Sequence, residues 1–379
     1  MIISISLVLV VGISCGAYYV WKKELYVPKI PFNPKSDLRD NIENIEMWFD
    51  SISRKNKFNG AVCIKYKNQV LLKRTFGNRS FNNIKVNNDT MFRLASLSKS
   101  YTAFGIMWLI KKYKLSYDEP ITTYLKLTMS CDITIRNLLN QTSGIQQDYI
   151  SLAKKMGKPN NEYVLTIQDA VKLIIKSIKE NSVEPNKQYL YNNSNYILLA
   201  GIIEEVSGKT FEEFMRSEVF EPLELFNTRV WNLVSDISIE KIKCISQGFE
   251  SYLNSDPLEV KPTWIDGVAG DGAVFSSVND LEKWSSIWDS NKLLTPEELS
   301  PAFELPKLNN GKTSNYGFGW VLNADSFWHN GKWLAANSFL MRSKTNDFSL
   351  ILVDNSTNMR FEKISEMLLI RLQYLKILN

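Results

Sequence analysis

A serine and a lysine three residues apart, Ser96 and Lys99, have the chemistry and the spacing of a catalytic pair. Positions i and i+3 share one face of a helix, so the two side chains would point into one cavity. Desolvation disfavours the charged form of a buried lysine, and a neutral amine can take the proton of a serine hydroxyl. Backbone N–H groups at a helix start would also stabilise a developing oxyanion. The pair therefore predicts a serine nucleophile with a lysine as its general base.

The same S-x-x-K spacing occurs again at Ser151 and Lys154, so spacing alone does not identify a site. The flanking sequence separates the two matches. A long apolar run, residues 103–110, follows the first match, whereas the second lies in a polar segment typical of a protein surface. We therefore place the nucleophile at Ser96 and interpret the second match as an ordinary helix turn.

Two further groups of polar residues could join this pair in a cleft. Tyr191 and Asn193 precede an apolar helical stretch, and a tyrosine can relay a proton while an amide can hold a substrate carbonyl or the lysine. His329 and Gly331 end a strand-like run, where a glycine lets a ligand approach the backbone. Each group also has a purely structural explanation, as a helix cap beside a core tyrosine or as a hydrogen-bonded histidine.

Strand-like segments stand toward both ends of the chain, with helical segments between them. Alternating or short apolar runs predict strands at residues 60–66, 70–76, 272–276, 316–322, 326–329, 337–342 and 348–354. Helical signals dominate residues 115–225. This order predicts a mixed α/β (α+β) fold, in which an antiparallel sheet from the N- and C-terminal segments is flanked by helices and carries an inserted all-α lobe.

The first 21 residues carry no charged side chain, and a helix of that length would reach about 31 Å, enough to cross a bilayer core. Residues 1–24 are therefore expected to be a membrane anchor or a signal segment. A single-pass anchor, a signal peptide cut after Ala17 and a lipoprotein signal acylated on Cys15 are the alternatives. Lys22 and Lys23 favour a cytoplasmic domain and the signal alternatives an exported one, so the side of the membrane stays open.

The composition excludes several classes of function. The chain has 379 residues, of which 44% are hydrophobic and 22% charged, and a net charge of +5, as in ordinary globular proteins. Its basic residues do not interleave with aromatic ones, so nucleic-acid binding is not expected. Four scattered cysteines and one histidine are too few ligands for a zinc or iron site, and no metal or organic cofactor is expected. Regularly spaced prolines predict an extended spacer over residues 25–38.

Taken in order, Ser-x-x-Lys, Tyr-x-Asn and His-x-Gly make the chain similar to serine β-lactamases and penicillin-binding proteins, and most of all to the class C β-lactamase and DD-peptidase branch. The resemblance covers residues 55–355. It includes further stretches at residues 138–144, 220–223, 270–284 and 316–320. It implies a serine hydrolase domain over residues 39–379, with the active cleft between two lobes.

The resemblance also implies two sets of site residues. The catalytic set holds the nucleophile, its general base, the proton shuttle and the third-motif histidine: Ser96, Lys99, Tyr191 and His329. The substrate-binding set holds an amide ligand, a strand glycine and a backbone donor: Asn193, Gly331 and Lys332. The N–H groups of Ser96 and Lys332 would form the oxyanion hole. Two departures from the family pattern, Gln141 and Glu224, are expected not to touch the three catalytic motifs.

The sequence therefore predicts a membrane-tethered serine hydrolase that cleaves an amide or ester bond of a small molecule or peptide through an acyl-enzyme. A histidine at 329, where most β-lactamases have lysine, favours a peptidase or esterase. The alternatives are a true β-lactamase or DD-peptidase acting on cell-wall peptides and, from another class, a catalytically silent scaffold. A Ser-His-Asp hydrolase using His329 lacks a suitable serine elbow. The substrate and the oligomeric state are left open.

Overall fold

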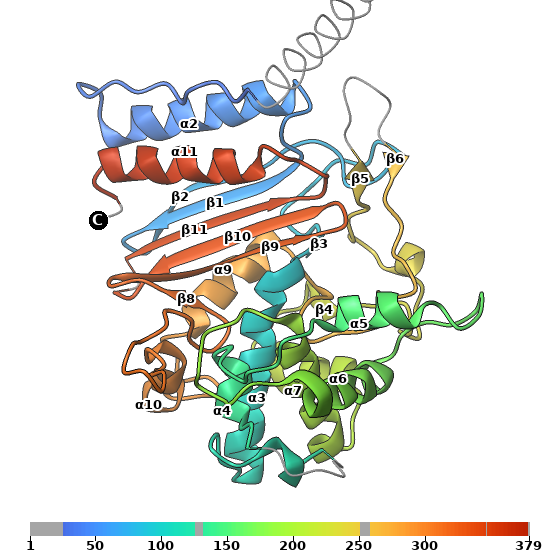
Figure 1. Cartoon of the computed structure of the whole chain (residues 1–379). Helices are drawn as coiled ribbons and strands as arrows, with labels where there is room; N and C mark the ends of the chain where they lie inside the picture. The colour runs from blue at the N-terminus through green and yellow to red at the C-terminus, as the bar shows by residue number, and fades with distance from the viewer. Residues whose placement is uncertain (1–25, 126–131, 251–257, 346, 378–379) are drawn as a thin grey trace, which may run out of the picture.

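A six-stranded antiparallel sheet forms the centre of the protein in a computed structural model that describes residues 26–125, 132–250, 258–345 and 347–377 (Figure 1). Its order is β2-β1-β11-β10-β9-β8. The strands are β1 (Gly60–Tyr66), β2 (Gln69–Thr75), β8 (Val321–Leu322), β9 (Ser326–Trp333), β10 (Ala336–Ser343) and β11 (Phe348–Asp354). Gly60 of β1 lies opposite Asp354 of β11, so the N- and C-terminal segments share one sheet, as predicted.

Several strand boundaries differ from the sequence prediction, and the structure explains two of these differences. Lys67 and Asn68 both adopt positive φ (48° and 61°), which a two-residue hairpin turn requires, so β2 already begins at Gln69. The strand expected at residues 316–322 contracts to Val321–Leu322. The preceding segment instead turns toward α3 (Ser98–Tyr113), the helix that carries Lys99. A Cβ on Gly319 would lie 2.7 Å from the carbonyl oxygen of Lys99. A segment this close to α3 does not pair with the sheet.

Helices cover both faces of the sheet. On one face, α2 (Leu38–Ser53) and α11 (Phe361–Tyr374) lie side by side and share an apolar core with the strands (Figure 1). The apolar positions of α2 recur at helical spacing and are buried, which explains its orientation. Asp37 caps α2 by accepting from the backbone N–H of Asp40.

The other face carries the site helix and the helical lobe, which share a larger apolar core. The helices and turns here are η1 (Ala95–Leu97), α3 (Ser98–Tyr113), η2 (Ile121–Thr123), α4 (Ile135–Leu139), α5 (Tyr149–Met156), α6 (Ile167–Asn181), α7 (Asn193–Ser207), α8 (Phe211–Phe214), η3 (Met215–Phe220), η4 (Ile239–Lys241), α9 (Val278–Ile287), α10 (Pro296–Leu299) and η5 (Ser300–Phe303). Short strands complete the fold: β3 (Phe92–Arg93), β4 (Thr228–Val230), β5 (Phe249–Glu250), β6 (Leu258–Glu259) and β7 (Val274–Ser276). The mixed fold with an inserted helical lobe is confirmed.

α9 supports α3 through aromatic packing. Tyr101 of α3 stacks on Trp284 of α9, with ring centroids 3.9 Å apart. The Trp284 Nε1–H also donates to Ser100 Oγ at 3.1 Å. Both aromatic residues are fully buried, so the position of α3 depends on that of α9.

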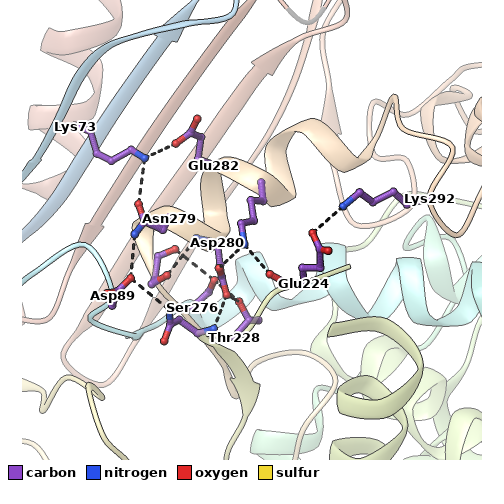
Figure 2. Close-up of polar contacts among 12 residues, drawn as sticks. Lys73, Asp89, Glu224, Thr228, Ser276, Asn279, Asp280, Glu282 and Lys292 are labelled. Atoms are coloured by element: carbon purple, nitrogen blue, oxygen red, sulfur yellow. Dashed lines mark hydrogen bonds and ion pairs between the residues drawn. The ribbon is translucent and has the colours of Figure 1, made fainter. Parts of the chain in front are cut away.

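A cluster of polar contacts in turn fixes α9 to the strands around it (Figure 2). Lys73 of β2 donates to Asn279 Oδ1 at 3.1 Å and forms an ion pair with Glu282. Asp280 accepts from Thr228 Oγ1 at 2.9 Å, and burial raises the pKa of this carboxyl group. We call these residues (Lys73, Thr228, Asn279, Asp280 and Glu282) the α9 polar cluster. It links β2, β4 and α9 and so holds the scaffold behind the site.

The expected anchor or signal segment, residues 1–24, lies outside the described residues. In the parts of the chain that the structure describes, no helix combines the length and the apolar character needed to cross a membrane. The described part of the predicted spacer packs against the domain. Ile30 is buried, and Trp48 Nε1 of α2 donates to the carbonyl oxygen of Pro28 at 2.8 Å.

Candidate active site

The predicted nucleophile and base lie together where η1 leads into α3. Ser96 belongs to η1, and Lys99 lies in the first turn of α3. Lys99 is fully buried, and its Nζ lies 3.0 Å from Ser96 Oγ. By contrast, Ser151 and Lys154, the other S-x-x-K match, are both exposed on α5. Flanking apolar sequence therefore distinguished the pair with a buried lysine from the surface pair.

The turn before the nucleophile has an unusual backbone conformation. Ala95 adopts a φ of 48°, in the left-handed region that costs an ordinary residue roughly 1 kcal/mol or more. The carbonyl oxygen of Leu94 accepts from Leu97 N at 3.2 Å and from Ser338 Oγ of β10 at 2.6 Å. These bonds tie the strained turn to the sheet and so fix the position of Ser96.

Three oxygen atoms surround Lys99 Nζ. They are Ser96 Oγ at 3.0 Å, Asn193 Oδ1 at 2.8 Å and the backbone carbonyl oxygen of Asp271 at 3.0 Å. Two of the three are carbonyl oxygens, which only accept. A neutral amine would donate its two N–H bonds to these carbonyls and direct its lone pair at the Ser96 hydroxyl, while an ammonium would donate to all three oxygens. No carboxylate of the described residues forms an ion pair with Lys99, so both protonation states have suitable partners.

The second motif sits at the start of α7. Asn192 caps the helix by accepting from Ser194 N at 2.9 Å, which leaves Asn193 in the first turn with its side chain on Lys99. Gln141 was expected not to touch the catalytic motifs, and this was wrong. Its Oε1 accepts from Asn192 N at 2.9 Å and from the side chain of Asn195. A neutral amide oxygen, always an acceptor, therefore holds the second motif in place.

The ring of Tyr191, and not its hydroxyl group, contacts Lys99. Lys99 Nζ is 5.0 Å from the ring centroid, a distance typical of a cation–π contact. Tyr191 is 38% exposed and packs edge-on against Tyr316, with centroids 5.8 Å apart. Its hydroxyl makes no hydrogen bond to another residue in the described parts of the chain. The structure therefore brings Tyr191 to the pair and leaves its hydroxyl available to a substrate.

His329 is buried in β9, and both ring nitrogens have partners. Nδ1 lies 2.5 Å from the carbonyl oxygen of Asn330, and because a carbonyl only accepts, Nδ1 must carry the proton. Nε2 then accepts from the Tyr316 hydroxyl at 2.9 Å. Burial, together with the nearby charge of Lys99, lowers the pKa of His329 to about 3. The ring is neutral at physiological pH and bonds Tyr316 rather than the nucleophile, which argues against a Ser-His-Asp arrangement.

Gly331 allows β9 to pass beside the nucleophile. A Cβ at this position would lie 2.0 Å from the carbonyl oxygen of Leu94 and 2.8 Å from the backbone nitrogen of Ser96. Neither contact is possible for a real side chain, so the close approach requires glycine. The strand backbone and the nucleophile turn thereby form one wall of the site.

Lys332 contributes its backbone to this wall and directs its side chain elsewhere. Asn330 lies opposite Phe339, which packs in the core on the α2–α11 side of the sheet. Since side chains alternate along a strand, Lys332 shares that face with Asn330 and points away from Ser96. Its backbone still lines the cavity at the nucleophile, where an N–H donor could bind an oxyanion.

A small cavity of about 70 Å³ opens onto Ser96 and is lined by carboxyl groups that sequence reasoning did not assign. Asp266 is paired with Arg93 (3.5 Å) and accepts from Trp333 Nε1 (2.6 Å). Asp271 accepts from the Tyr149 hydroxyl at 3.3 Å, and burial raises the pKa of Asp271 to about 6 although Lys99 opposes this. The one signal for Asp271 was its position between two glycines.

The chain matches the Beta-lactamase family over residues 48–373. It belongs to that family. It is 30% identical to Penicillin-binding protein 4* of Bacillus subtilis (strain 168) over 327 residues, which are 83% of this chain and 71% of the relative. It is 26% identical to teichoic acid D-alanine hydrolase of Staphylococcus aureus over 263 residues, 66% of this chain and 59% of the relative.

A solved structure, a penicillin-binding protein homologue from Pyrococcus abyssi, has the same fold. The TM-score is 0.74 at 22% identity, and the match covers 88% of this chain and 77% of the other. The family predicted from the three motifs is thus confirmed, and so is the prediction that the chain is a hydrolase-type enzyme.

Proposed function

We propose that the protein cleaves an amide or ester bond of a small molecule or peptide through an acyl-enzyme on Ser96. The observation that carries this proposal is the 3.0 Å contact between Ser96 Oγ and a buried lysine that otherwise binds only neutral carbonyl oxygens. An activated serine of this kind attacks a carbonyl carbon and splits one difficult hydrolysis into two easier steps.

In the first step, Lys99 takes the Ser96 proton as Oγ bonds to the substrate carbonyl carbon. The N–H groups of Ser96 and Lys332 donate to the resulting oxyanion. The bond to the leaving group then breaks, and the Tyr191 hydroxyl returns the proton to the departing nitrogen or oxygen. Asn193 holds Lys99 with its Oδ1, and its Nδ2 donates to the substrate carbonyl.

In the second step, water replaces the leaving group. Its proton passes to the Lys99–Tyr191 pair as its oxygen attacks the acyl carbon. The ester bond to Ser96 breaks, the serine regains its proton, and the acid is released. Atoms and charges balance with water as the only co-reactant.

The sequence left two alternatives, a β-lactamase or DD-peptidase and a silent scaffold. The name of the Bacillus subtilis relative supports the first, and the name of the Staphylococcus aureus relative supports removal of an alanyl group as a further candidate. A silent scaffold is disfavoured, because Lys99 contacts both Ser96 and Tyr191.

Rapid kinetics with p-nitrophenyl propionate test the proposal. We expect a burst of about one p-nitrophenol per enzyme, followed by slower turnover, because an acyl-enzyme accumulates. Ser96→Ala should lose both phases, and Ser151→Ala, the matched serine on the exposed face of α5, should keep both. Hydrolysis that survives Ser96→Ala would contradict the proposal. Nitrocefin and a D-alanyl-D-alanine peptide, run in parallel, separate a β-lactamase from a DD-peptidase.

We also propose that residues 1–24 tether the domain to a membrane, which is supported by the absence of charged side chains in the first 21 of them. Leu9→Arg with Val11→Arg should move the full chain from the membrane pellet to the soluble fraction. An unchanged distribution in a carbonate extraction would contradict the tether.

A further inference from the structure

Two cavities of very different size lie on either side of one arginine. The cavity at Ser96 has a volume of about 70 Å³, and a second cavity of about 1050 Å³ lies beyond it. Among the residues that the structure describes, Arg93 is the only one that lines both cavities. Arg93 belongs to β3, the short strand that leads into the turn of the nucleophile. Its side chain is therefore the boundary between the small space at Ser96 and the larger space.

The Arg93 side chain is fixed by an ion pair and by an aromatic ring. Its Nη1 lies 3.5 Å from Asp266, and its guanidinium carbon lies 5.1 Å from the centroid of the Phe275 ring. Asp266 is itself anchored, because it accepts from Trp333 Nε1 at 2.6 Å and from Thr263 N at 2.7 Å. Only 11% of the Arg93 side chain is exposed. The guanidinium is thus held between the two cavities and separates them.

The wall of the large cavity next to Arg93 is apolar. Trp231, Ile242, Ile245 and Phe275 line this cavity, and these four buried side chains pack in one apolar cluster. Phe275 is also the ring that contacts the guanidinium. An alkyl chain that extended past position 93 would be buried against this cluster. Each methylene group buried in this way strengthens binding roughly fourfold.

The small cavity lies on the acyl side of the nucleophile. Its lining includes Ser96 and Lys332, whose N–H groups donate to the oxyanion in the proposed mechanism. Tyr191, which protonates the leaving group in that mechanism, is not among the described residues that line it. The leaving group therefore lies toward Tyr191, and the tail of the acyl group points into the small cavity toward Arg93. A volume of about 70 Å³ corresponds to roughly two water molecules, so the tail has room for about two carbon atoms.

We propose that Arg93 is a specificity-determining residue that limits the length of the acyl group. This inference rests on the proposed function and specifies the acyl side of the same site. In the wild type, the acyl tail ends against the guanidinium, so short acyl groups fit and longer ones do not. Without the Arg93 side chain, the two cavities join and a longer alkyl chain reaches the apolar wall at Phe275.

A matched pair of substrates measures this limit. p-Nitrophenyl hexanoate and p-nitrophenyl propionate have the same leaving group and no charge, and they differ only in the length of the acyl chain. In the wild type, the hexanoate should have the lower kcat/KM. We expect the ratio of kcat/KM for hexanoate to that for propionate to rise at least about tenfold in Arg93→Ala, because the added methylene groups become buried. Since the two esters are compared on the same protein, the fraction of folded enzyme cancels in the ratio.

Two variants serve as controls for this ratio. Arg229 of β4 lies opposite Phe275 in the strand register, as Arg93 of β3 does, and it forms an ion pair with Glu212 at 3.7 Å. Because Arg229 lines neither cavity, Arg229→Ala should leave the ratio unchanged. Arg93→Lys keeps a long cation opposite Asp266 and should raise the ratio much less than Arg93→Ala. An equal rise in Arg229→Ala would mean that loss of an ion pair, and not the opened boundary, changes the ratio, and would overturn the inference.

Binding measurements separate this inference from the proposed function. In Ser96→Ala, calorimetry should show weaker binding of hexanamide than of propionamide, and the added Arg93→Ala substitution should raise the relative affinity for hexanamide at least about tenfold. An unchanged preference in Arg93→Ala would overturn the inference while Ser96-dependent hydrolysis stands. A wild type that hydrolyses the hexanoate as fast as the propionate would overturn it as well, even if Arg93→Ala does not fold. The expected change in binding without any hydrolysis would overturn the proposed function and leave the inference supported.

Discussion

Two lysines of this protein donate to an asparagine side chain, and they differ in what else surrounds them. Lys73, in the α9 polar cluster, donates to Asn279 Oδ1 at 3.1 Å and forms an ion pair with Glu282 (Figure 2). Lys99 donates to Asn193 Oδ1 at 2.8 Å, and its other partners are a hydroxyl and a backbone carbonyl. One lysine therefore has a permanent anionic partner, and the other has none.

The comparison shows that a lysine can stabilise the fold at one position and be suited to proton transfer at another. An adjacent carboxylate stabilises the ammonium form, so Lys73 holds β2 and α9 together as a fixed cation. Neutral acceptors satisfy either protonation state of Lys99, which a proton-transfer group requires. Lys73 can therefore serve as the control position for substitutions of Lys99.

The largest difference between the two lysines should appear on their removal. Lys99→Met should lower kcat/KM for p-nitrophenyl propionate by about 10²–10⁴-fold, the usual contribution of a general base. Lys73→Met should change kcat/KM by no more than about threefold and lower the free energy of unfolding by about 1 kcal/mol, as expected for a partly exposed ion pair. Comparable catalytic losses in the two variants would contradict the distinction.

A double-mutant cycle sharpens the role of Lys99. Tyr191 contacts this lysine with its ring, and Tyr191→Phe should cost roughly 10²-fold in kcat/KM if its hydroxyl shuttles the proton. Because the two residues act on one proton, the double variant should lose little more than the worse single variant. Losses that multiply would mean that the lysine and the tyrosine work independently.

The relative turnover of neutral substrates and of substrates with a carboxylate tests whether position 329 lacks a fixed positive charge. The neutral ring provides no charge for a substrate carboxylate, so neutral p-nitrophenyl esters should turn over faster than penicillins or cephalosporins. His329→Lys introduces such a charge, and we expect the ratio of the two kcat/KM values to narrow by several fold. Efficient β-lactam hydrolysis by the wild type, above that of small esters, would refute the prediction.

The smallest expected effect is on stability at acidic pH. His329 has a pKa of about 3 in the folded protein, below its usual 6.5, so only the unfolded chain binds the proton between these values. The stabilising contribution is complete above about pH 6.5 and is lost as the pH falls toward 3. Between pH 7.5 and 4.5, the wild type should lose about 2 kcal/mol more stability than His329→Gln in urea unfolding.

Asp271 changes the stability with pH in the opposite direction, since its pKa is raised to about 6. Its stabilising contribution is present at low pH and is lost as the pH rises from about 4 toward 6. The wild type and His329→Gln both retain Asp271, so this contribution cancels in the difference between them. Parallel pH dependence in the wild type and His329→Gln would show that the histidine is not held neutral.

Local sequence patterns were sufficient to predict which residues meet at the candidate site. Ser96 and Lys99 are neighbours on one turn, and the apolar run after them distinguishes this pair, whose lysine is buried, from the exposed Ser151 and Lys154. Strand alternation likewise indicated the central sheet, because one face of each strand is buried. Asn193 and Gly331 were candidates from their local context, and the family resemblance then gave them a role. The structure shows the contact of Asn193 with Lys99 and the close approach of Gly331 to the nucleophile turn.

Contacts between distant segments could not be predicted in this way. Asp271 is 172 residues from Lys99, and no spacing rule places its carbonyl on that lysine. Gln141 supports the second motif 51 residues away through a single oxygen atom. Tyr316 was assigned to a strand, yet its hydroxyl is the hydrogen-bond partner of His329 Nε2. Such interactions depend on how the lobes pack, which one sequence does not specify locally.

The central claim is that Ser96 is the nucleophile, and mapping of a covalent adduct tests it most directly. The full chain is incubated with a fluorophosphonate, digested, and sequenced by mass spectrometry. We expect one adduct, on Ser96, which Ser96→Ala abolishes and Ser151→Ala leaves intact. Ser98 should stay unlabelled, because it is buried and its Oγ accepts from Val274 N at 3.1 Å. An adduct on Ser98 or Ser151, or labelling that survives Ser96→Ala, would contradict the account.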